Sequence, residues 1–190
     1  MLRGLGLPPQ RAARFLLGKI LVRRLADRTL RARIVETEAY LAQRDPAAHV
    51  FRGRTPRNAP LFGPPGTLYV YFVYGMHHCL NLAVDRAGRA GCVLIRAAEL
   101  LDPDGGAANM TSGSGPGRLT RCLKIGTSLS GRHLFEHNAR LTLRDGPLPP
   151  RVGVSTRVGI RQGGERLLRF FDARSDAVSS PRPKRARRSE

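Results

Sequence analysis

Hydrophobic and polar residues alternate along much of the chain with the period of two that is typical of β-strands. The clearest strand is predicted over 67–74, where Leu, Val and Phe are interspersed with three tyrosines. Apolar runs at 19–23 and 30–40 flank a turn at 26–28, which predicts a pair of antiparallel strands. Further strands are predicted over 91–97, after a turn at 85–88, and more weakly over 134–143, 152–160 and 166–171.

Two segments show the spacing of a helix instead. Residues 10–17 carry apolar side chains three and four positions apart, after prolines that suit a first turn and before a glycine that suits the end. A second short helix is predicted over 118–123. The stretches 43–65 and 102–117, with many glycines and other turn-forming residues, are predicted to be loops. The pattern indicates one α+β (mixed α/β) domain with a mainly antiparallel sheet.

The last part of the chain offers little apolar material. From residue 173 onward we expect little to be buried, and 181–188 is strongly basic, a composition typical of disorder. We therefore expect a folded domain over residues 1–179 and a basic, disordered tail over 180–190.

Composition narrows the class of protein. The chain has 190 residues, of which 41% are hydrophobic, enough for one domain with a sizeable core. No apolar run approaches the roughly 18–20 residues of a membrane span, and the first residues lack the pattern of a secretion signal. Three cysteines, few and odd in number, exclude a disulfide scaffold and fit a reducing compartment. We therefore expect a soluble protein with no membrane association.

Charge changes the picture most. The chain has 33 Lys and Arg residues against 14 Asp and Glu, a formal net charge of +19, and all but three of the basic residues are arginine. An excess of this size predicts a polyanionic partner, and nucleic acid is the first choice. An anionic membrane is the weaker alternative, because no long amphipathic helix with a basic face is present. An arginine-rich genome would explain the preference for Arg over Lys but not the net charge.

All four tyrosines lie between residues 40 and 74, beside an arginine-rich loop. Tyrosines of this kind fill the core of a sheet, or they stack on bases while arginines hold phosphates. Tyr69 and Tyr71 share one face of the predicted strand, and Tyr74 lies on the other face near a glycine turn. One strand could therefore supply both a stacking wall and a protruding wedge.

Two carboxylates stand out because acidic residues are scarce. The period of two places Glu36, Glu38 and Tyr40 on one face of the predicted strand. Such glutamates are most often exposed on a solvated face. A carboxylate beside a phosphate-binding surface would weaken binding, however, so the alternative is a chemical use, such as a general base that activates water. The spacing does not choose between Glu36 and Glu38.

Other catalytic and metal-binding patterns are missing from the sequence. His77, His78 and Cys79 are consecutive, which is not the spacing of a metal site. The turn at 63–66 lacks the Lys and Ser or Thr of a phosphate-binding loop, and no Ser or Cys has the surroundings of an activated nucleophile. We therefore expect neither a metal nor an organic cofactor.

Several motifs occur together in the order found in one known family. They lie at 33–41 (RIVETEAYL), 47–49 (AAH), 55–58 (TPRN), 65–71 (PGTLYVY), 74–76 (YGM), Asn81, 92–97 (CVLIRA) and 157–160 (RVGI). Over residues 8–179 the chain resembles the alkyladenine (3-methyladenine) DNA glycosylase family. The resemblance implies a single domain with a curved, mainly antiparallel sheet and flanking helices. It also implies a monofunctional enzyme that starts base excision repair by flipping alkylated purines out of double-stranded DNA and hydrolysing the N-glycosidic bond. Whether deaminated purines are accepted as well is left open by the sequence.

The resemblance implies catalytic roles for three residues. Glu38 matches the general base that activates the attacking water, and Arg96 and the main-chain carbonyl of Val158 match the groups that hold this water. A carboxylate at this point would both deprotonate the water and stabilise the positive charge that develops on the sugar.

The resemblance also implies a pocket for the flipped base. Tyr40 and His49 match one wall and Tyr71 the other, and the His49 backbone N–H would bind the base edge. These π-rich walls suit alkylated purines, whose rings carry positive charge. The remaining matches are Asn81, which tests the purine substituents, Leu94 beside it, the wedge Tyr74, and the DNA-contacting residues Met76, His77, Arg54, Arg57 and Arg118.

The chain departs from the family pattern at three places. His77 and His78 replace an aromatic pair, the loop at Gly53 and Arg54 is one residue shorter, and 177–179 lacks a tryptophan. These departures concern the DNA contacts and the rim of the pocket rather than the chemistry.

Two other functions compete with this one. A non-catalytic, basic nucleic-acid-binding protein would explain the charge and the tyrosines but leaves the two glutamates without a use. A glycosylase that is also a lyase needs an amine; all three lysines lie outside the motifs, which leaves the N-terminal amine as the open alternative. We expect a monomer that binds double-stranded DNA containing damaged purines, in the cytoplasm of a prokaryote or the nucleus of a eukaryote.

Overall fold

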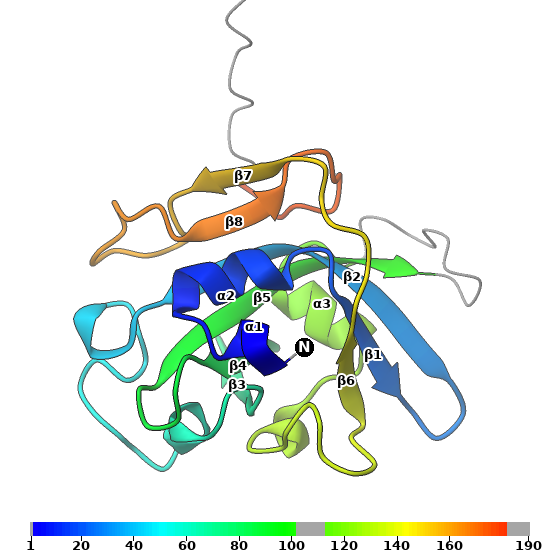
Figure 1. Ribbon diagram of the computed structural model, residues 1–190, viewed down its shortest axis with the longest axis horizontal. Coiled ribbons are helices and arrows are strands. Elements are labelled where there is room, and N and C mark those ends of the chain that lie inside the picture. Colours follow the sequence, from blue (N-terminus) through cyan, green and yellow to red (C-terminus); the bar gives the residue numbers. More distant parts are fainter. Residues whose placement is uncertain (1, 102–112, 182–190) are drawn as a thin grey trace, which may run out of the picture.

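The longest strand, β2 (Thr29–Tyr40), organises the fold in a computed structural model that describes residues 2–101 and 113–181 (Figure 1). β5 (Gly91–Leu101) pairs with one edge of β2, and β1 (Ile20–Arg24) and then β8 (Arg169–Asp172) pair with the other. The order of the antiparallel sheet is β3-β4-β5-β2-β1-β6, and β7 pairs with β8. The remaining strands are β3 (Leu68–Val73), β4 (His77–Val84), β6 (Leu141–Arg144) and β7 (Val152–Ser155).

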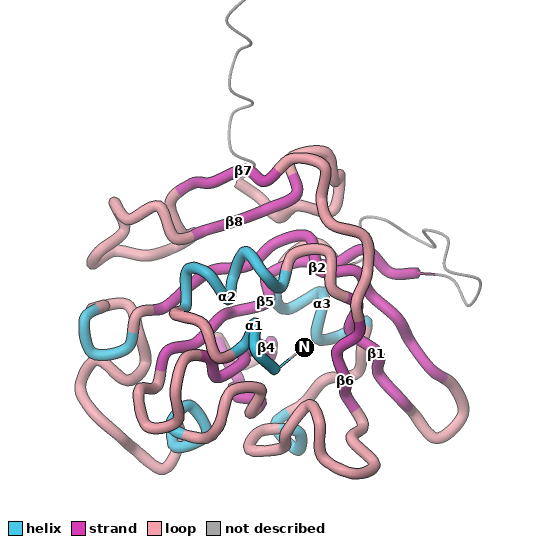
Figure 2. The backbone as a smooth tube through the Cα atoms, in the orientation of Figure 1, coloured by secondary structure: helices cyan, strands magenta, loops and turns pink. Residues whose placement is uncertain are grey.

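A β-bulge lies where β2 changes its neighbour from β1 to β8. The register between β2 and β5 shifts between Ile34 and Glu36 and again between Glu36 and Thr37. Bulges bend a strand and increase its twist, and from Glu36 to Glu38 the free edge of β2 pairs with β8. The sheet curls at this point, so that the β7–β8 hairpin lies at one end of the molecule and β3 and β4 toward the other (Figure 2).

Short helices pack against the sheet. α2 (Pro9–Leu16) buries Ala12, Ala13 and Leu16 and packs on β2 and β5. α1 (Leu2–Leu5) packs on α2, and α3 (Pro116–Cys122) packs on β4 and β5. Single 3₁₀ turns lie at Ala42–Arg44, Ala59–Phe62 and Thr127–Leu129. None of the helices in the described part of the chain has the length and apolar character needed to cross a membrane.

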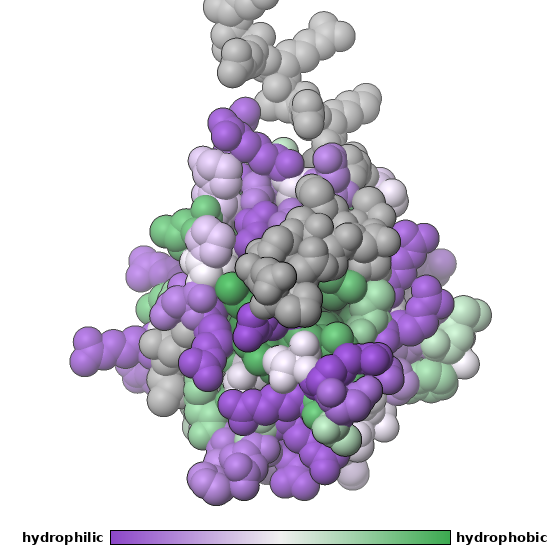
Figure 3. All heavy atoms as spheres, turned by 90° about the vertical axis from the view of Figure 1, so that its right-hand side faces the viewer, coloured by the Kyte–Doolittle hydropathy of each residue, from purple (hydrophilic) through white to green (hydrophobic). Residues whose placement is uncertain are grey.

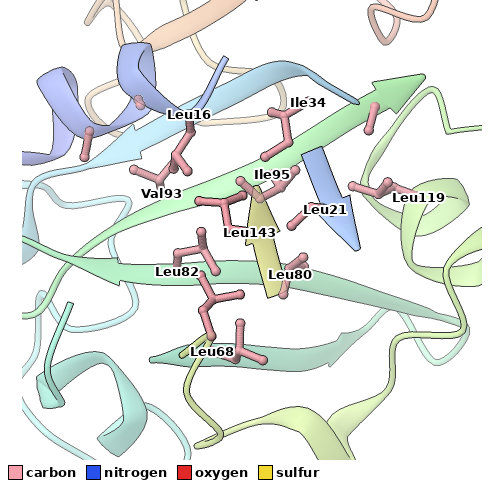
Figure 4. Packing of buried hydrophobic residues seen from close by; sticks show 14 of the residues in the cluster. Leu16, Leu21, Ile34, Leu68, Leu80, Leu82, Val93, Ile95, Leu119 and Leu143 are labelled. Carbon is pink, nitrogen blue, oxygen red and sulfur yellow. The ribbon is translucent and has the colours of Figure 1, made fainter. Parts of the chain in front are cut away.

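Aliphatic side chains from one face of the sheet form the main core (Figure 4). Leu80 and Leu82 of β4 lie with Val93 and Ile95 of β5, all fully buried, in one cluster with Leu16 of α2. Because side chains alternate along a strand, the residues between them point to the opposite face of the sheet. That second face carries the polar and aromatic side chains of the candidate site.

The predicted α+β domain with a mainly antiparallel sheet is confirmed. The predicted strands 19–23, 30–40, 67–74 and 91–97 correspond to β1, β2, β3 and β5, the segment 166–171 overlaps β8, and the helices 10–17 and 118–123 correspond to α2 and α3. Neither α1 nor β4 was predicted. The polar start of β4, at His77 and His78, obscures the alternation of Leu80, Leu82 and Val84 that follows.

Three sequence-based predictions are wrong. Of 134–143, only the end belongs to a strand, and the strand predicted over 152–160 ends at Ser155. The prediction that little is buried after residue 173 is also wrong, because Ala177, Val178 and Ser179 are at most 5% exposed. Residues 102–112 of the predicted loop and 182–190 of the predicted tail lie outside the described residues.

The face that carries the tip of the β1–β2 hairpin is dominated by hydrophilic side chains (Figure 3). Arg24, Arg28 and Arg31 of this hairpin are exposed. With a formal net charge of +19, a surface of this kind attracts polyanions over distances of about a Debye length, roughly 10 Å at 0.1 M salt.

The core predicts a clear difference between two leucines. Replacing the fully buried Leu82 by alanine should lower the free energy of unfolding by about 2–5 kcal/mol, because a cavity is left behind. The same change at Leu148, which is 74% exposed, should cost less than about 0.5 kcal/mol. Urea unfolding followed by circular dichroism measures both values. Equal losses would contradict the assigned core.

Candidate active site

A cavity of about 470 Å³ opens on the face of the sheet opposite the main core. Strand register builds this face: Tyr69 of β3 is paired with Asn81 of β4, Asn81 with Leu94 of β5, and Leu94 with Glu38 of β2. The row crosses four strands, so residues distant in the sequence are brought to one surface. Loop residues 158–160 complete the wall on the side of β2.

Most of the predicted site residues surround this cavity. Those that line it are Tyr40, His49, Tyr71, Asn81, Leu94, Arg96 and Val158, together with the partly or fully exposed Arg57, Tyr74 and His77. Glu38, Arg54, Met76 and Arg118 are not among the lining residues; Glu38 lies behind Tyr40, Arg96 and Val158, which it contacts. Arg54 lies over the ring of Phe62, Met76 is 68% exposed in the β3–β4 turn, and Arg118 is exposed on α3.

The Glu38 carboxylate is fully buried and joins three of the lining residues. One oxygen, Oε1, accepts a hydrogen bond from the backbone N–H of Val158 at 2.8 Å and lies 3.5 Å from Nη1 of Arg96. The other, Oε2, accepts the hydroxyl of Tyr40 at 2.9 Å. Burial raises the pKa of Glu38, and Arg96, the Val158 N–H and the Tyr40 hydroxyl oppose that rise. The carboxyl therefore takes up a proton more readily than a solvated one.

Glu36 is equally buried but has a different environment. Its Oε1 accepts hydrogen bonds from Nε of Arg96 at 3.0 Å, Nε of Arg169 at 2.6 Å and the Ser179 hydroxyl at 3.0 Å. Its Oε2 accepts the Ser179 backbone N–H at 2.7 Å. Two arginines and a serine thus donate hydrogen bonds to this carboxylate. The geometry separates two glutamates that the sequence left equivalent: Glu38 contacts three residues of the cavity wall and Glu36 contacts one.

A second ion pair supports the wall that holds Val158. Arg157 binds Asp45 through both terminal nitrogens, and its Nη1 also donates to the carbonyl of Ala39 at 3.1 Å. The Arg157 guanidinium lies 4.6 Å from the ring centroid of Tyr40, on which it stacks. One side chain thereby ties the loop around Val158 to the end of β2 and to Tyr40.

The aromatic side chains are arranged differently from the expected two walls. His49 and Tyr71 are in direct contact, with ring centroids 4.5 Å apart, and His49 Nδ1 lies 2.9 Å from the hydroxyl of Tyr69. A base stacked between two rings needs ring planes about 7 Å apart, so no base fits between His49 and Tyr71 here. The expectation that His49 faces Tyr71 across the base is not met; His49 lies at the edge of Tyr71, which leaves Tyr40 and Tyr71 as the candidate walls.

Tyr74 projects from a turn rather than from the face of a strand. β3 ends at Val73, and Tyr74 has a φ of 53° and is 86% exposed. We predicted the direction of Tyr74 from the alternation of side chains along a strand. That reason is wrong, because Tyr74 lies beyond the strand and its left-handed turn conformation sets the direction of its side chain. Such a conformation is uncommon for a residue other than glycine and is typically found where structure serves a function.

The thiols of the cavity are not activated. Cys79 and Cys92 line it, and burial raises the pKa of both, to about 12 for Cys92. Burial, together with Arg57, lowers the pKa of His49, so its imidazole is neutral at pH 7. Among residues 2–101 and 113–181, no three His, Cys, Asp or Glu side chains are grouped as metal ligands.

The sequence reasoning missed three of the supporting residues: Asp45, Arg169 and Ser179. Asp45 could have been singled out from the sequence, because it is an acidic residue in an arginine-rich loop and acidic residues are scarce in this chain. Nothing in the sequence singles out Arg169 and Ser179, because their partner Glu36 lies 133 and 143 positions away in the chain.

Comparison with known proteins identifies a family that the chain resembles. The model of a protein family described as methylpurine-DNA glycosylase matches residues 5–176. A relative in Chlorobium phaeovibrioides, named as a candidate 3-methyladenine DNA glycosylase, is 43% identical over 187 residues, covering 93% of this chain and 94% of the relative. Relatives with the same name in Synechococcus elongatus and Methanocella arvoryzae are 46% and 38% identical, over 96% and 93% of this chain and 90% and 93% of theirs.

The two glutamates should differ in their effect on stability. Glu36→Gln removes the negative charge that two buried arginines share, so it should lower the free energy of unfolding by about 3–5 kcal/mol. Glu38→Gln should cost clearly less, because within the described residues only the Arg96 guanidinium lies within 4 Å of that carboxylate, at 3.5 Å, and burial already disfavours its charge. Thermal and urea unfolding at pH 7 measure both. A larger loss for Glu38→Gln would reverse the assignment of the structural carboxylate.

Proposed function

This chain belongs to the methylpurine-DNA glycosylase family, and on that premise we propose that it flips alkylated purines out of duplex DNA and hydrolyses their N-glycosidic bond with Glu38 as general base. A member of this family is a DNA glycosylase, a hydrolase of N-glycosyl bonds that acts in DNA repair. The observation that carries the proposal for Glu38 is its position, buried, hydrogen-bonded to Tyr40 and Val158 and paired with Arg96 in the cavity wall.

The proposed reaction uses a water held beside Glu38. Arg96 Nη1 and Glu38 Oε1 are 3.5 Å apart, which leaves no room for a water between them, but a water beside the pair would bond to both. The carbonyl of Val158 would be its third partner. The water oxygen attacks C1′ of the sugar, its proton passes to Glu38, and the electrons of the C1′–N bond remain on the purine. The raised pKa of Glu38 suits it to accept this proton.

The same carboxylate favours the transition state. The glycosidic bond breaks with positive, oxocarbenium-like charge on the sugar, and a negative charge in a water-excluded site stabilises it strongly. An alkylated purine carries positive charge before cleavage and leaves as a neutral base. The chain therefore needs no acid on the leaving group for this class of lesion.

Base recognition is proposed for the Tyr40–Tyr71 slot. Two π faces attract a cationic purine, and a neutral His49 at the slot's edge adds no repulsion. The backbone N–H of His49 would bind the base edge, while Asn81 and Leu94, neighbours in the strand register, would test the substituents of the purine. Hypoxanthine, a deaminated purine of the same size, is a candidate second substrate.

The DNA is proposed to lie across the mouth of the cavity. Flipping costs a few kcal/mol of stacking and pairing, which an inserted side chain offsets by filling the gap. Tyr74, exposed on its turn, is the proposed wedge, flanked by Met76 and His77. Arg54, Arg57 and Arg118 are proposed to contact the phosphates. A non-catalytic DNA-binding protein has no use for a buried carboxylate behind the wall of this cavity.

The direct experiment is excision from defined DNA. The full chain is incubated with methylated duplex DNA and the released bases are identified by chromatography. Oligonucleotides with one hypoxanthine, treated with alkali to cleave abasic sites, test the second substrate class. Release of 3-methyladenine supports the proposal, and DNA binding without any base release contradicts it.

The catalytic role predicts the effect of a charge change. Glu38→Gln keeps the size of the side chain but cannot accept the proton, so single-turnover excision should fall by about 10²-fold or more. Binding to undamaged duplex should be unchanged. The matched control is Glu165→Gln, at a glutamate whose side chain is 76% exposed, and it should excise at the wild-type rate. Full activity of Glu38→Gln would refute this general base.

The proposed division between the two tyrosines predicts different substrate dependence. Tyr71→Ala removes a stacking surface, worth about 1–3 kcal/mol on the base, so it should impair excision from duplex and single-stranded DNA alike. Tyr74→Ala removes the wedge, so it should impair mainly the duplex reaction, where a base stack must be opened. The same lesion placed in both kinds of DNA gives the comparison. Equal losses for Tyr74→Ala on both substrates would rule out the wedge.

A further inference from the structure

We infer that Ser179 is a positioning residue, which holds the guanidinium of Arg96 in the orientation that faces Glu38. The segment after β8 would thus complete the active site, although it contributes no residue to the cavity lining. The inference rests on the proposed role of Glu38 as general base.

Each nitrogen of Arg96 points to a different group. Nε donates to Oε1 of Glu36 at 3.0 Å, Nη2 donates to the Ser179 hydroxyl at 3.1 Å, and Nη1 lies 3.5 Å from Oε1 of Glu38. A guanidinium is a rigid planar fork. Two fixed hydrogen bonds therefore determine where the third nitrogen lies.

The Ser179 hydroxyl makes two hydrogen bonds. It accepts from Arg96 and donates to Oε1 of Glu36 at 3.0 Å, so it uses its proton and one of its two lone pairs. Its backbone is anchored as well: the N–H donates to Glu36 at 2.7 Å, and the carbonyl accepts from Nη2 of Arg169 at 2.8 Å. The residue is 3% exposed, and an alanine side chain can supply neither hydroxyl bond.

Loss of this hydroxyl would favour a competing arrangement. Arginine pairs most strongly with a carboxylate through two parallel hydrogen bonds, and Glu36 already binds Nε of Arg96. With Nη2 released, the fork can turn toward Glu36 and form such a pair. Nη1 then moves away from Glu38. Ser179 prevents this by holding Nη2, while Arg169 and the Ser179 N–H satisfy Glu36 from the other side.

The charge on Arg96 governs the protonation of Glu38. Burial raises the pKa of Glu38, and the positive charge of Arg96 is the largest influence that lowers it. If Arg96 turns away, the pKa rises further, and the carboxylate is lost at a higher pH. The charged or titratable groups that also face Glu38 are Glu36 and Tyr40 of β2, Cys79 of β4 and Arg157 of the loop before Val158. None of them is bonded to Ser179 except Glu36.

The test compares Ser179→Ala with Val178→Ala in the full chain. Val178 is 5% exposed and apolar, so its truncation loosens the same segment without removing a hydrogen bond to Arg96. The Glu38 carboxyl is titrated by ¹³C NMR in the DNA-free protein, where the chain's six glutamates give few signals and Glu38→Gln identifies the one of interest. Single-turnover excision of a methylated purine is followed over the same pH range.

Ser179→Ala should titrate Glu38 higher by roughly half to one pH unit, move the acid limb of the rate profile upward by the same amount, and lower the plateau rate by about tenfold. Val178→Ala should keep the wild-type titration and profile. If Ser179→Ala does not fold, Ser179→Cys, with a weakly hydrogen-bonding thiol of similar size, replaces it.

An unchanged Glu38 titration in the serine variant, or an equal shift in Val178→Ala, would overturn the inference. If the wild-type protein releases no methylated purine, the proposed function fails, and the carboxyl titration still decides the role of Ser179.

Discussion

The structure depends on burying charged side chains only together with partners of opposite charge. Glu36, Glu38, Arg96 and Arg169 are each at most 7% exposed, and any one of them alone would be prohibitively expensive to desolvate. Together they are neutral and almost every polar atom is bonded. The fold must therefore bring β2, β5, β8 and the following segment to one point. This is possible because β1 pairs with β2 only as far as Arg33, which leaves the same edge open to β8 where the glutamates lie.

The two faces of the sheet have different roles, one in the hydrophobic core and the other in the candidate site. On one, leucine, isoleucine and valine side chains pack into a core that carries the stability. On the other, tyrosines, an asparagine and charged residues surround a cavity that is lined both by paired strands and by loop residues such as 158–160. The Arg157–Asp45 pair then ties the loop around Val158 to this rigid base. Groups that must meet a sugar carbon within a fraction of an ångström benefit from such support.

The sequence predicts what depends on local pattern and misses what depends on distant partners. Period two correctly places Glu36, Glu38 and Tyr40 on one face, and both glutamates do meet Arg96. This periodicity does not show which glutamate is the structural one, because that depends on the hydrogen bonds that Glu36 accepts from Arg169 and Ser179, more than 130 positions away. The strand β4 was missed because polar residues at its start hide its alternation, and the projection of Tyr74 depends on a backbone angle that no residue pattern near it specifies. The motifs, by contrast, identify most of the cavity lining.

The link between Glu36 and Ser179 has a kinetic consequence. It joins residues 143 positions apart, and contacts of such separation form late, because the entropy of closing a long loop must be overcome first. A partly folded chain can build the β1–β2 hairpin and much of the sheet, yet its buried carboxylates lack their partners until the C-terminal segment docks. The arrangement around Arg96 is complete only when this segment has docked.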